Sequence, residues 1–239
     1  MLKRMIRSLI NSCGYDFHKI RKQEPKHPFS VLKYIIFERM QNNPDFYFVQ
    51  IGANDGLAND PIRPLVRQFH MKGLLVEPMP DFFARLTKNY ADEPQLGFEN
   101  CAIGAVDGAV SLFRFKPDAP LPDNFFHGMA RFDKSYMLAR ARSIGLNDAI
   151  EEIRVPALTF VTLVRKHNIR KIDFLQIDTE GFDFEIIKMA FSLSVLPEII
   201  NYEWTELSAE DRYACKTLLA EKGYSFVDIG PDVLCVLNP

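Results

Sequence analysis

Residues 46–56 constrain the fold most strongly, because a strand pattern runs directly into a glycine turn. The first six of them are mostly aromatic or β-branched, which favours a buried, pleated strand. Gly52 permits a sharp turn and lets a ligand lie against bare backbone. After the turn, Asn59 or Asp60 can cap a helix that has Pro61 at its first position. The stretch therefore predicts the start of a βαβ unit, whose ligands bind where the strands end.

Glu77 ends the second predicted strand, which covers Gly73 to Val76. An acid at this tip can accept hydrogen bonds from both hydroxyl groups of a ribose. The turn after the first strand has neither a G-x-G-x-x-G nor a P-loop pattern, and Asp55 would repel a pyrophosphate. These residues favour a ligand with a ribose, no phosphates and a positive charge, such as S-adenosylmethionine. A plain strand-to-helix turn without a ligand is the alternative.

The composition is that of an ordinary globular protein, with 47% hydrophobic and 25% charged residues. A length of 239 residues suits one large α/β domain with a sizeable core. The formal net charge of −2 provides no global basic field, so we expect no nucleic-acid partner.

The cysteines show neither a CxxC pair nor zinc-ligand spacing (Cys13, Cys101, Cys215 and Cys235). Free thiols without a disulfide framework are typical of a reducing compartment. We therefore expect a cytoplasmic protein.

Residues 1–44 are expected to form a helical lead-in, and residues 45–239 one domain with an insertion at about 117–150 on the substrate side. The first ten residues are basic and amphipathic, but they lack the apolar core and cleavage site of a signal peptide. We expect a solvated or packed leading helix, with weak contact to a membrane surface as the alternative. No apolar run of about 18 residues occurs, so no transmembrane helix is expected.

Strand and helix patterns alternate along the domain and predict an α/β, Rossmann-like fold, with a mostly parallel sheet and helices on both faces. A third strand is expected over Phe98 to Ile103, and a terminal hairpin across Gly230-Pro231. Helical spacing also predicts helices over Lys134 to Ile144 and Asn147 to Ile153.

Residues 117–133 interrupt this alternation with prolines, aromatic residues and His127. Long loops of this kind often form lids or binding loops. We expect such a loop here, and a packed surface excursion is an equally good alternative. The preceding residues, Ala109 to Phe115, have the alternation of an exposed hairpin strand.

Acids lie at the ends of three predicted strands, at Asp55, Glu77 and Asp178. Because open α/β sheets bind ligands outside the carboxyl ends of their strands, we expect these acids at one site. Asp178 can orient an acceptor group or remove its proton, and Glu180 can assist. His127 is a third candidate base, suited to neutral pH. In the alternative interpretation, Asp178 and Glu180 both interact with the N-terminus of the following helix.

We expect no metal ion at this site. Because carboxylate oxygens suit hard divalent cations, an ion held by Asp178 with Glu180 or Glu203 is an alternative that the sequence leaves open.

Four motifs occur in order along the chain: Val49-Gln50-Ile51-Gly52-Ala53-Asn54-Asp55-Gly56, Val76-Glu77-Pro78, Asn100-Cys101-Ala102-Ile103-Gly104 and Ile177-Asp178-Thr179-Glu180-Gly181. Each motif is weak alone, but the ordered set resembles the FkbM family of S-adenosylmethionine-dependent methyltransferases over roughly residues 45–230. The resemblance implies a class I methyltransferase fold, whose seven-stranded sheet has an antiparallel terminal strand.

The resemblance also implies roles for individual residues. Gly52 to Gly56 would line the methionine part of the cofactor, Glu77 would hold its ribose, and Asn100 to Ala102 would border its adenine. The implied cofactor-binding residues are Gly52, Ala53, Asn54, Asp55, Gly56, Glu77, Pro78, Asn100, Cys101, Ala102 and Asp178.

The activity implied by the resemblance is O-methylation of a hydroxyl group on a small molecule or a glycan, with Asp178, Glu180 and His127 as catalytic candidates. Two other functions are the alternatives. The missing G-x-G-x-x-G pattern and the acid in the turn disfavour a nicotinamide-dependent oxidoreductase. The intact strand-end acids disfavour a non-catalytic Rossmann-like binding protein.

Overall fold

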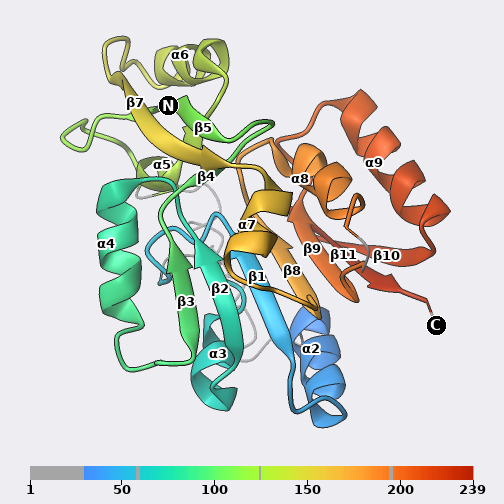
Figure 1. Cartoon of the computed structure of the whole chain (residues 1–239). Helices are drawn as coiled ribbons and strands as arrows, with labels where there is room; N and C mark the ends of the chain where they lie inside the picture. The colour runs from blue at the N-terminus through green and yellow to red at the C-terminus, as the bar shows by residue number, and fades with distance from the viewer. Residues whose placement is uncertain (1–29, 58–59, 124, 194–195, 239) are drawn as a thin grey trace, which may run out of the picture. The chain divides into compact units, whose positions relative to one another are not determined.

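Seven strands form the central sheet, and their order brings the ends of β1, β2 and β8 side by side (Figure 1). From one edge to the other the strands are β3 (Leu96–Glu99), β2 (Lys72–Val76), β1 (Tyr47–Ile51), β8 (Phe174–Ile177), β9 (Ile199–Glu203), β11 (Asp232–Leu237) and β10 (Tyr224–Ile229). The strands from β3 to β9 pair in parallel, whereas β11 is antiparallel to both neighbours. The predicted α/β fold is confirmed, with one addition: the last strand of the hairpin lies inside the sheet, between β9 and β10.

The computed structural model describes residues 30–57, 60–123, 125–193 and 196–238. Leu32–Pro239 form one compact unit. The predicted basic lead-in up to residue 29, Cys13 and the cap at Asn59 lie outside the described residues. In the described ranges, no helix is both long and apolar enough to cross a membrane.

Helices cover both faces of the central sheet. Side chains alternate between the faces, and Val49, Leu175 and Ile200 face a buried cluster shared with α7 (Phe160–Lys166), α8 (Asp183–Ala190) and α9 (Ala209–Glu221). Figure 1 shows α7 in front of β1 and β8. The buried residues of α2 (Val31–Gln41), α3 (Arg63–Phe69) and α4 (Pro80–Asn89) lie outside this cluster, and Phe82 of α4 belongs to another cluster with Ala102 and Leu112.

A row of buried amides crosses the opposite face of the central sheet in register. Gln50 on β1 lies opposite Gln176 on β8, and Gln176 lies opposite Asn201 on β9. The Asn201 side-chain amide donates hydrogen bonds to Gln176 Oε1 and Asp232 Oδ2, both at 3.0 Å. Because residues two apart share a face, Asp178 and Glu203 continue this polar row at the strand ends.

Helix α3 begins two residues later than the sequence predicts. Asp60 does act at its start, since Asp60 Oδ1 accepts hydrogen bonds from the backbone N–H groups of Ile62 and Arg63 at 3.0 and 3.1 Å. The proline in its first turn is Pro64, and Pro61 stands before the helix.

A second sheet of four strands was not predicted. Its order is β4 (Ala102–Ile103), β7 (Ile150–Leu158), β5 (Gly108–Phe115) and β6 (Ala130–Arg131), and it carries the helices α5 (Phe125–Gly128) and α6 (Lys134–Ser143). Strand β5 pairs antiparallel with β7 along its whole length. The strand expected over Ala109 to Phe115 is therefore present as β5, but its second half is largely buried and not exposed. The helix expected over Lys134 to Ile144 is present as α6.

Two predictions in this region were wrong. The helix expected over Asn147 to Ile153 is largely the first part of β7, because Ile150 and Ile153 have helical spacing while the pairing with β5 decides the conformation. The single strand expected over Phe98 to Ile103 is divided between β3 and β4, which belong to different sheets. The polypeptide leaves the central sheet between them, at Asn100 and Cys101.

Candidate functional site

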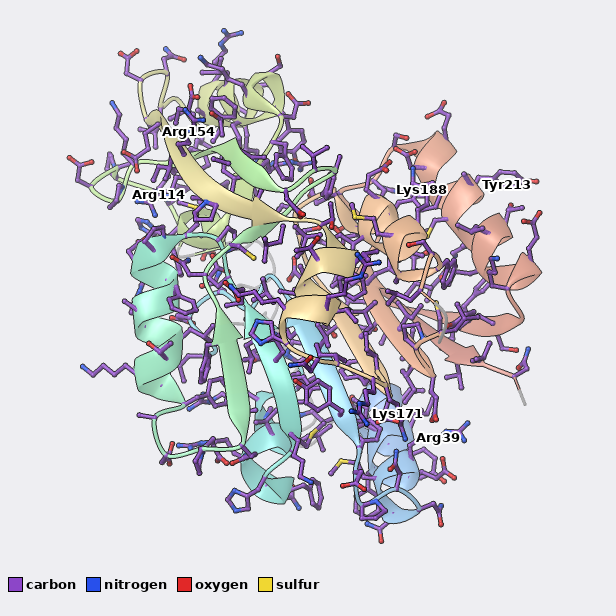
Figure 2. The ribbon with its side chains drawn as sticks, viewed as in Figure 1. Arg39, Arg114, Arg154, Lys171, Lys188 and Tyr213 are labelled. Carbon is purple, nitrogen blue, oxygen red and sulfur yellow. The ribbon has the colours of Figure 1, made fainter. Side chains whose placement is uncertain are left out.

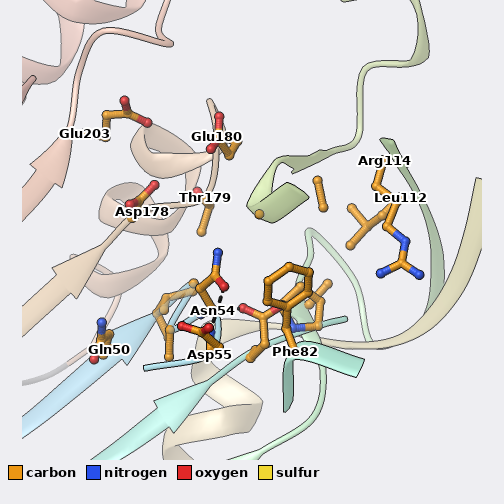
Figure 3. Close-up of a pocket in the computed structure, with 18 of the residues that line it drawn as sticks. Gln50, Asn54, Asp55, Phe82, Leu112, Arg114, Asp178, Thr179, Glu180 and Glu203 are labelled. Atoms are coloured by element: carbon orange, nitrogen blue, oxygen red, sulfur yellow. Dashed lines mark hydrogen bonds between the residues drawn. The ribbon is translucent and has the colours of Figure 1, made fainter. Parts of the chain in front are cut away.

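A cavity of about 1160 Å³ lies at the carboxyl ends of β1, β2, β8 and β9. Figure 3 shows Asp178, Glu180 and Glu203 on one side of it, and Phe82, Leu112 and Arg114 on the opposite side. Its lining includes most residues predicted from the sequence: Gly52, Ala53, Asn54, Asp55, Glu77, Pro78, Cys101, Ala102, His127, Asp178 and Glu180. The structure thus brings the strand-end acids and the loop histidine to one cavity.

Gly56 and Asn100 were also predicted to bind the cofactor, but they are not among the residues lining this cavity. Gly56 packs on α4, since a Cβ there would lie 2.6 Å from the ring of Tyr90. The Asn100 side-chain amide donates to the carbonyl oxygens of Glu77 and Pro78 at 2.8 and 3.1 Å. Both residues therefore support the loops that carry the lining residues.

Gly52 occupies a position that only glycine fits. Its φ is +81°, and a Cβ there would lie 1.8 Å from the carbonyl oxygen of Asp178. The N–H groups of Gly52 and Ala53 both donate to the carbonyl of Val76 at 3.0 Å. The turn after β1 is therefore held directly between the ends of β2 and β8.

Glu77 connects the first and second turns through its side chain. Glu77 Oε2 accepts a hydrogen bond from the Asn54 N–H at 2.8 Å, and Oε1 accepts one from the Met79 N–H at 2.9 Å. Burial raises the pKa of this carboxyl group to about 7, and the two backbone donors oppose the shift. Each oxygen keeps a second lone pair for a ligand hydroxyl group.

The turn that carries Asp178 and Glu180 is organised by a residue that the sequence analysis missed, the buried Asp183. Asp183 Oδ2 accepts from the Thr179 hydroxyl at 2.8 Å and from the Gly181 N–H at 3.3 Å, and Oδ1 accepts from the Glu203 N–H at 3.2 Å. Among the residues that the structure describes, no side chain caps α8. The acids in the first turn of that helix are Asp183 and Glu185, whereas the alternative interpretation placed Asp178 and Glu180 at its N-terminus.

Carboxylates crowd this side of the cavity. The pKa of Asp178 is raised well above its usual range because the group lies deep in the protein and because Glu180 and Glu203 are close. Its side chain is nevertheless open to the cavity. Burial and the neighbouring acids Glu203 and Glu206 raise the pKa of Glu180 to about 8, while Arg131 lowers it. Burial and crowding therefore disfavour the charged forms of these acids, so each is a stronger base than an isolated carboxyl group.

Three of these acids are spaced closely enough to share a ligand. In the part of the chain that the structure describes, Asp178, Glu180 and Glu203 each offer an oxygen, and these oxygens lie within 4.8 Å of one another. Glu180 Oε2 is buried without a hydrogen-bond partner among the described residues. The group could take a cationic ligand group or a divalent ion, so the sequence-based expectation of no metal stays a prediction.

The opposite wall combines apolar side chains with a paired arginine. Phe82 and Leu112 pack in one cluster. Arg114 on β5 donates to Asp81 at 2.5 Å and to Glu151 at 2.8 Å, and Figure 2 shows it beside the N-terminal end of α4. This wall therefore offers a ligand mainly apolar contact.

His127 comes to the cavity on α5, within the segment predicted as a lid or binding loop. The helix lies against the turn after β1, because a Cβ at Gly128 would lie 2.2 Å from the Asn54 side-chain nitrogen. Pro117, Asp123 and Phe132 from the same segment also line the cavity. The expectation that this segment forms part of the binding site is consistent with its position, and whether it closes over a ligand stays a prediction.

The sequence analysis also missed Arg131 and Glu206, which form an ion pair between β6 and the loop after β9. They are 75 residues apart, and neither belongs to a motif. The only sequence signal for Glu206 is its position, because it is an acid just beyond a predicted strand. Arg131 gave none, because the strand that carries it is two residues long.

A family model described as the methyltransferase FkbM domain matches residues 50–226. No curated protein matches the chain. A solved FkbM methyltransferase from Methylobacillus flagellatus KT is 12% identical, with 80% of this chain and 44% of that chain covered and a TM-score of 0.49.

Other solved structures are similar at the same level. An O-methyltransferase from Bacillus cereus in complex with SAH is 10% identical, with both chains fully covered and a TM-score of 0.46. An RNA methyltransferase from Salinibacter ruber in complex with S-adenosyl-L-homocysteine is 10% identical, with 88% of this chain and 92% of that chain covered and a TM-score of 0.40. The family model spans most of the chain and includes three of the four motifs completely. The chain belongs to the FkbM methyltransferase domain family.

Proposed function

We propose that this chain is an S-adenosylmethionine-dependent O-methyltransferase that acts on a hydroxyl group of a small molecule or a glycan. The observation that carries the proposal is the meeting of Asp178 and Glu180 with the Gly52 turn and Glu77 around one cavity. The family assignment supports methyl transfer over the nicotinamide-dependent oxidation weighed from the sequence. The alternative function is that of a non-catalytic binding protein, and the labelling experiment distinguishes the two.

S-adenosylmethionine is the methyl donor of this family, and the residues present fit it. Glu77 is a buried carboxyl group with spare lone pairs for the ribose hydroxyls. Gly52, where a Cβ would meet the Asp178 carbonyl oxygen, lets the turn and the end of β8 come together at the cavity, and acids around the cavity suit the ammonium and sulfonium charges. Cys101 and Ala102 supply the wall that the adenine would contact.

When bound, this cofactor supplies an electrophilic methyl group together with its own leaving group, so the protein has to position the acceptor and take a proton. Asp178 is open to the cavity and would accept the hydrogen of the acceptor hydroxyl as its oxygen becomes methylated. Crowded carboxylates with raised pKa values are stronger bases than isolated ones, which suits this task. Thr179 and Asp183 would keep the Asp178 turn in one conformation.

The choice of acceptor is a proposal that rests on the chain's charge and cavity. The net charge of −2 and the acidic cavity disfavour a nucleic acid as the acceptor, because its phosphate backbone is negatively charged.

A reducing compartment such as the cytoplasm is proposed because Cys101, Cys215 and Cys235 are free cysteines.

Incubation with methyl-labelled S-adenosylmethionine and fractionated cell extract tests the function. We expect label in a methyl ether of a small molecule or glycan, identified by mass spectrometry. Label at nitrogen or carbon, or in RNA, would contradict the proposed acceptor. Tight binding of S-adenosylhomocysteine without transfer to any fraction would support the binding-protein alternative.

The affinity for S-adenosylhomocysteine is expected to rise with pH and to level off above pH 7. Below pH 7 Glu77 is protonated in the free protein, since its raised pKa is about 7, and only its carboxylate form accepts both ribose hydroxyl hydrogens. As the pH is raised toward that pKa, the dissociation constant should fall by up to about tenfold per pH unit. Calorimetry over about pH 5.5 to 8.5, the range in which Glu77 titrates, measures the effect.

Glu77→Gln provides the control, because its amide keeps the shape of the side chain and does not titrate in this range. The pH dependence should be much flatter in this variant, and melting curves at each pH would show that both proteins remain folded. An equally steep dependence in Glu77→Gln would exclude Glu77 as its origin.

A further inference from the structure

Arg131 is a buried cation that extends from the second sheet to the carboxylate side of the cavity. It is 8% exposed. Its Nη1 donates to Glu206 Oε2, and its Nη2 lies 3.4 Å from the Glu206 carbonyl oxygen. One guanidinium thus holds both the side chain and the backbone of Glu206, in the loop that follows β9.

The Tyr136 ring and the Gly181 backbone lie against the Arg131 guanidinium. Its central carbon lies 3.7 Å from the centre of the Tyr136 ring, and the Tyr136 hydroxyl donates to Glu206 Oε2 at 2.7 Å. A Cβ at Gly181 would lie only 2.3 Å from Arg131 Nη2. Arg131 therefore touches the turn of Asp178 and Glu180 on one side and α6 of the second sheet on another.

The charges around this contact are unbalanced without Arg131. Burial and the neighbouring acids Glu203 and Glu206 raise the pKa of Glu180, and Arg131 opposes the shift. A buried arginine in such a place is worth more as a fixed, planar donor than as a charge alone, because its fork makes several directed hydrogen bonds. Lysine would keep the charge and lose that geometry.

We propose that Arg131 is a positioning residue for methyl transfer, which locks Glu206 and the Asp178–Gly181 turn against the second sheet. The inference rests on the proposed function and adds a residue from outside the family motifs. Arg131 is absent from the cavity lining, so it acts through the turn and through Glu206. The second sheet, which supplies Leu112 and Arg114 to the opposite wall of the cavity, and the candidate base Asp178 then keep one relative geometry.

Arg131→Gln is expected to lower kcat by about 10–100-fold, because displacement of a reacting group by about 1 Å can cost a factor of about 100. The affinity for S-adenosylhomocysteine should change less than about twofold, since Glu77 and the Gly52 turn do not contact Arg131. Arg131→Lys should restore only part of kcat, and Tyr136→Phe, which removes one donor to Glu206, should lower kcat by a smaller factor. Arg154→Gln is the matched control, because Arg154 is an exposed arginine of the same sheet, on β7 in Figure 2.

Hydrogen exchange of the peptide that spans residues 178–183 supplies a readout that needs no acceptor. It should be faster in Arg131→Gln than in the wild type and unchanged in Arg154→Gln. If the wild type transfers no methyl group, the proposed function fails while this exchange still tests the contact. Wild-type kcat in Arg131→Gln would overturn the proposal, and so would full rescue by Arg131→Lys or a parallel loss of cofactor affinity and kcat.

Discussion

Asp178→Asn is expected to lower kcat by about 10²–10⁴-fold, the range for loss of a general base, while the affinity for S-adenosylhomocysteine stays nearly constant. Asparagine keeps the shape of the side chain and removes its charge and its basicity. The backbone stays in place because the Asp178 N–H donates to the Ile51 carbonyl at 2.9 Å, a bond that the substitution preserves. The cofactor would still be held by Glu77 and the Gly52 turn.

Turnover and calorimetric affinity measured on one preparation separate the possible roles of Asp178. Normal turnover would remove Asp178 from catalysis. Joint loss of cofactor affinity and turnover would place it in the cofactor shell, where the family resemblance also puts it.

Glu180→Gln and His127→Gln, tested in the same assay, distinguish the three candidate bases. Glu180 lies next to Asp178, but one of its oxygens is buried without a partner among the described residues, so Asp178 is the more accessible of the two carboxylates. His127 reaches the cavity from the other side, on α5. We therefore expect the largest loss of kcat in Asp178→Asn; a larger loss in His127→Gln would move the proton transfer to the second sheet.

The central sheet could be predicted because its strands are short apolar runs that end in acids or glycines. The run before Asp178 is almost continuously buried, as a strand between two parallel neighbours must be. The same pattern predicted the cavity, since parallel strands present their carboxyl ends at one edge. Local sequence was sufficient wherever the feature depended on a strand and the turn directly after it.

The second sheet could not be predicted in the same way. Its long pair, β5 with β7, joins residues about 40 positions apart, as in the hydrogen bond from Ser111 to Glu152 with a separation of 41. Local spacing in β7 suggested a helix, and the pairing partner overrode it. Asp183, Arg131 and Glu206 were missed for the same reason: their roles arise from tertiary contacts, which neither composition nor periodicity contains.

Gly52→Ala is expected to destabilise the protein by about 3 kcal/mol or more and to weaken cofactor binding. A positive φ alone costs an alanine about 1–3 kcal/mol. At Gly52 the added Cβ would also lie 1.8 Å from the Asp178 carbonyl oxygen, so backbone has to move. That movement displaces both the cofactor turn and the candidate base, because the two strand ends touch at this point.

Gly145→Ala separates the two costs. Gly145 has nearly the same φ, +78°, and no heavy atom of the described residues lies within 4 Å of a Cβ built there. It should therefore show the cost of φ alone, a drop in melting temperature of about 2–4 °C per kcal/mol for a chain of this size, with cofactor affinity unchanged. Thermal melts and S-adenosylhomocysteine calorimetry on both variants measure the difference. Equal destabilisation of the two variants would mean that the ends of β1 and β8 separate easily. It would contradict the close contact of Gly52 with Asp178, on which the geometry of the site depends.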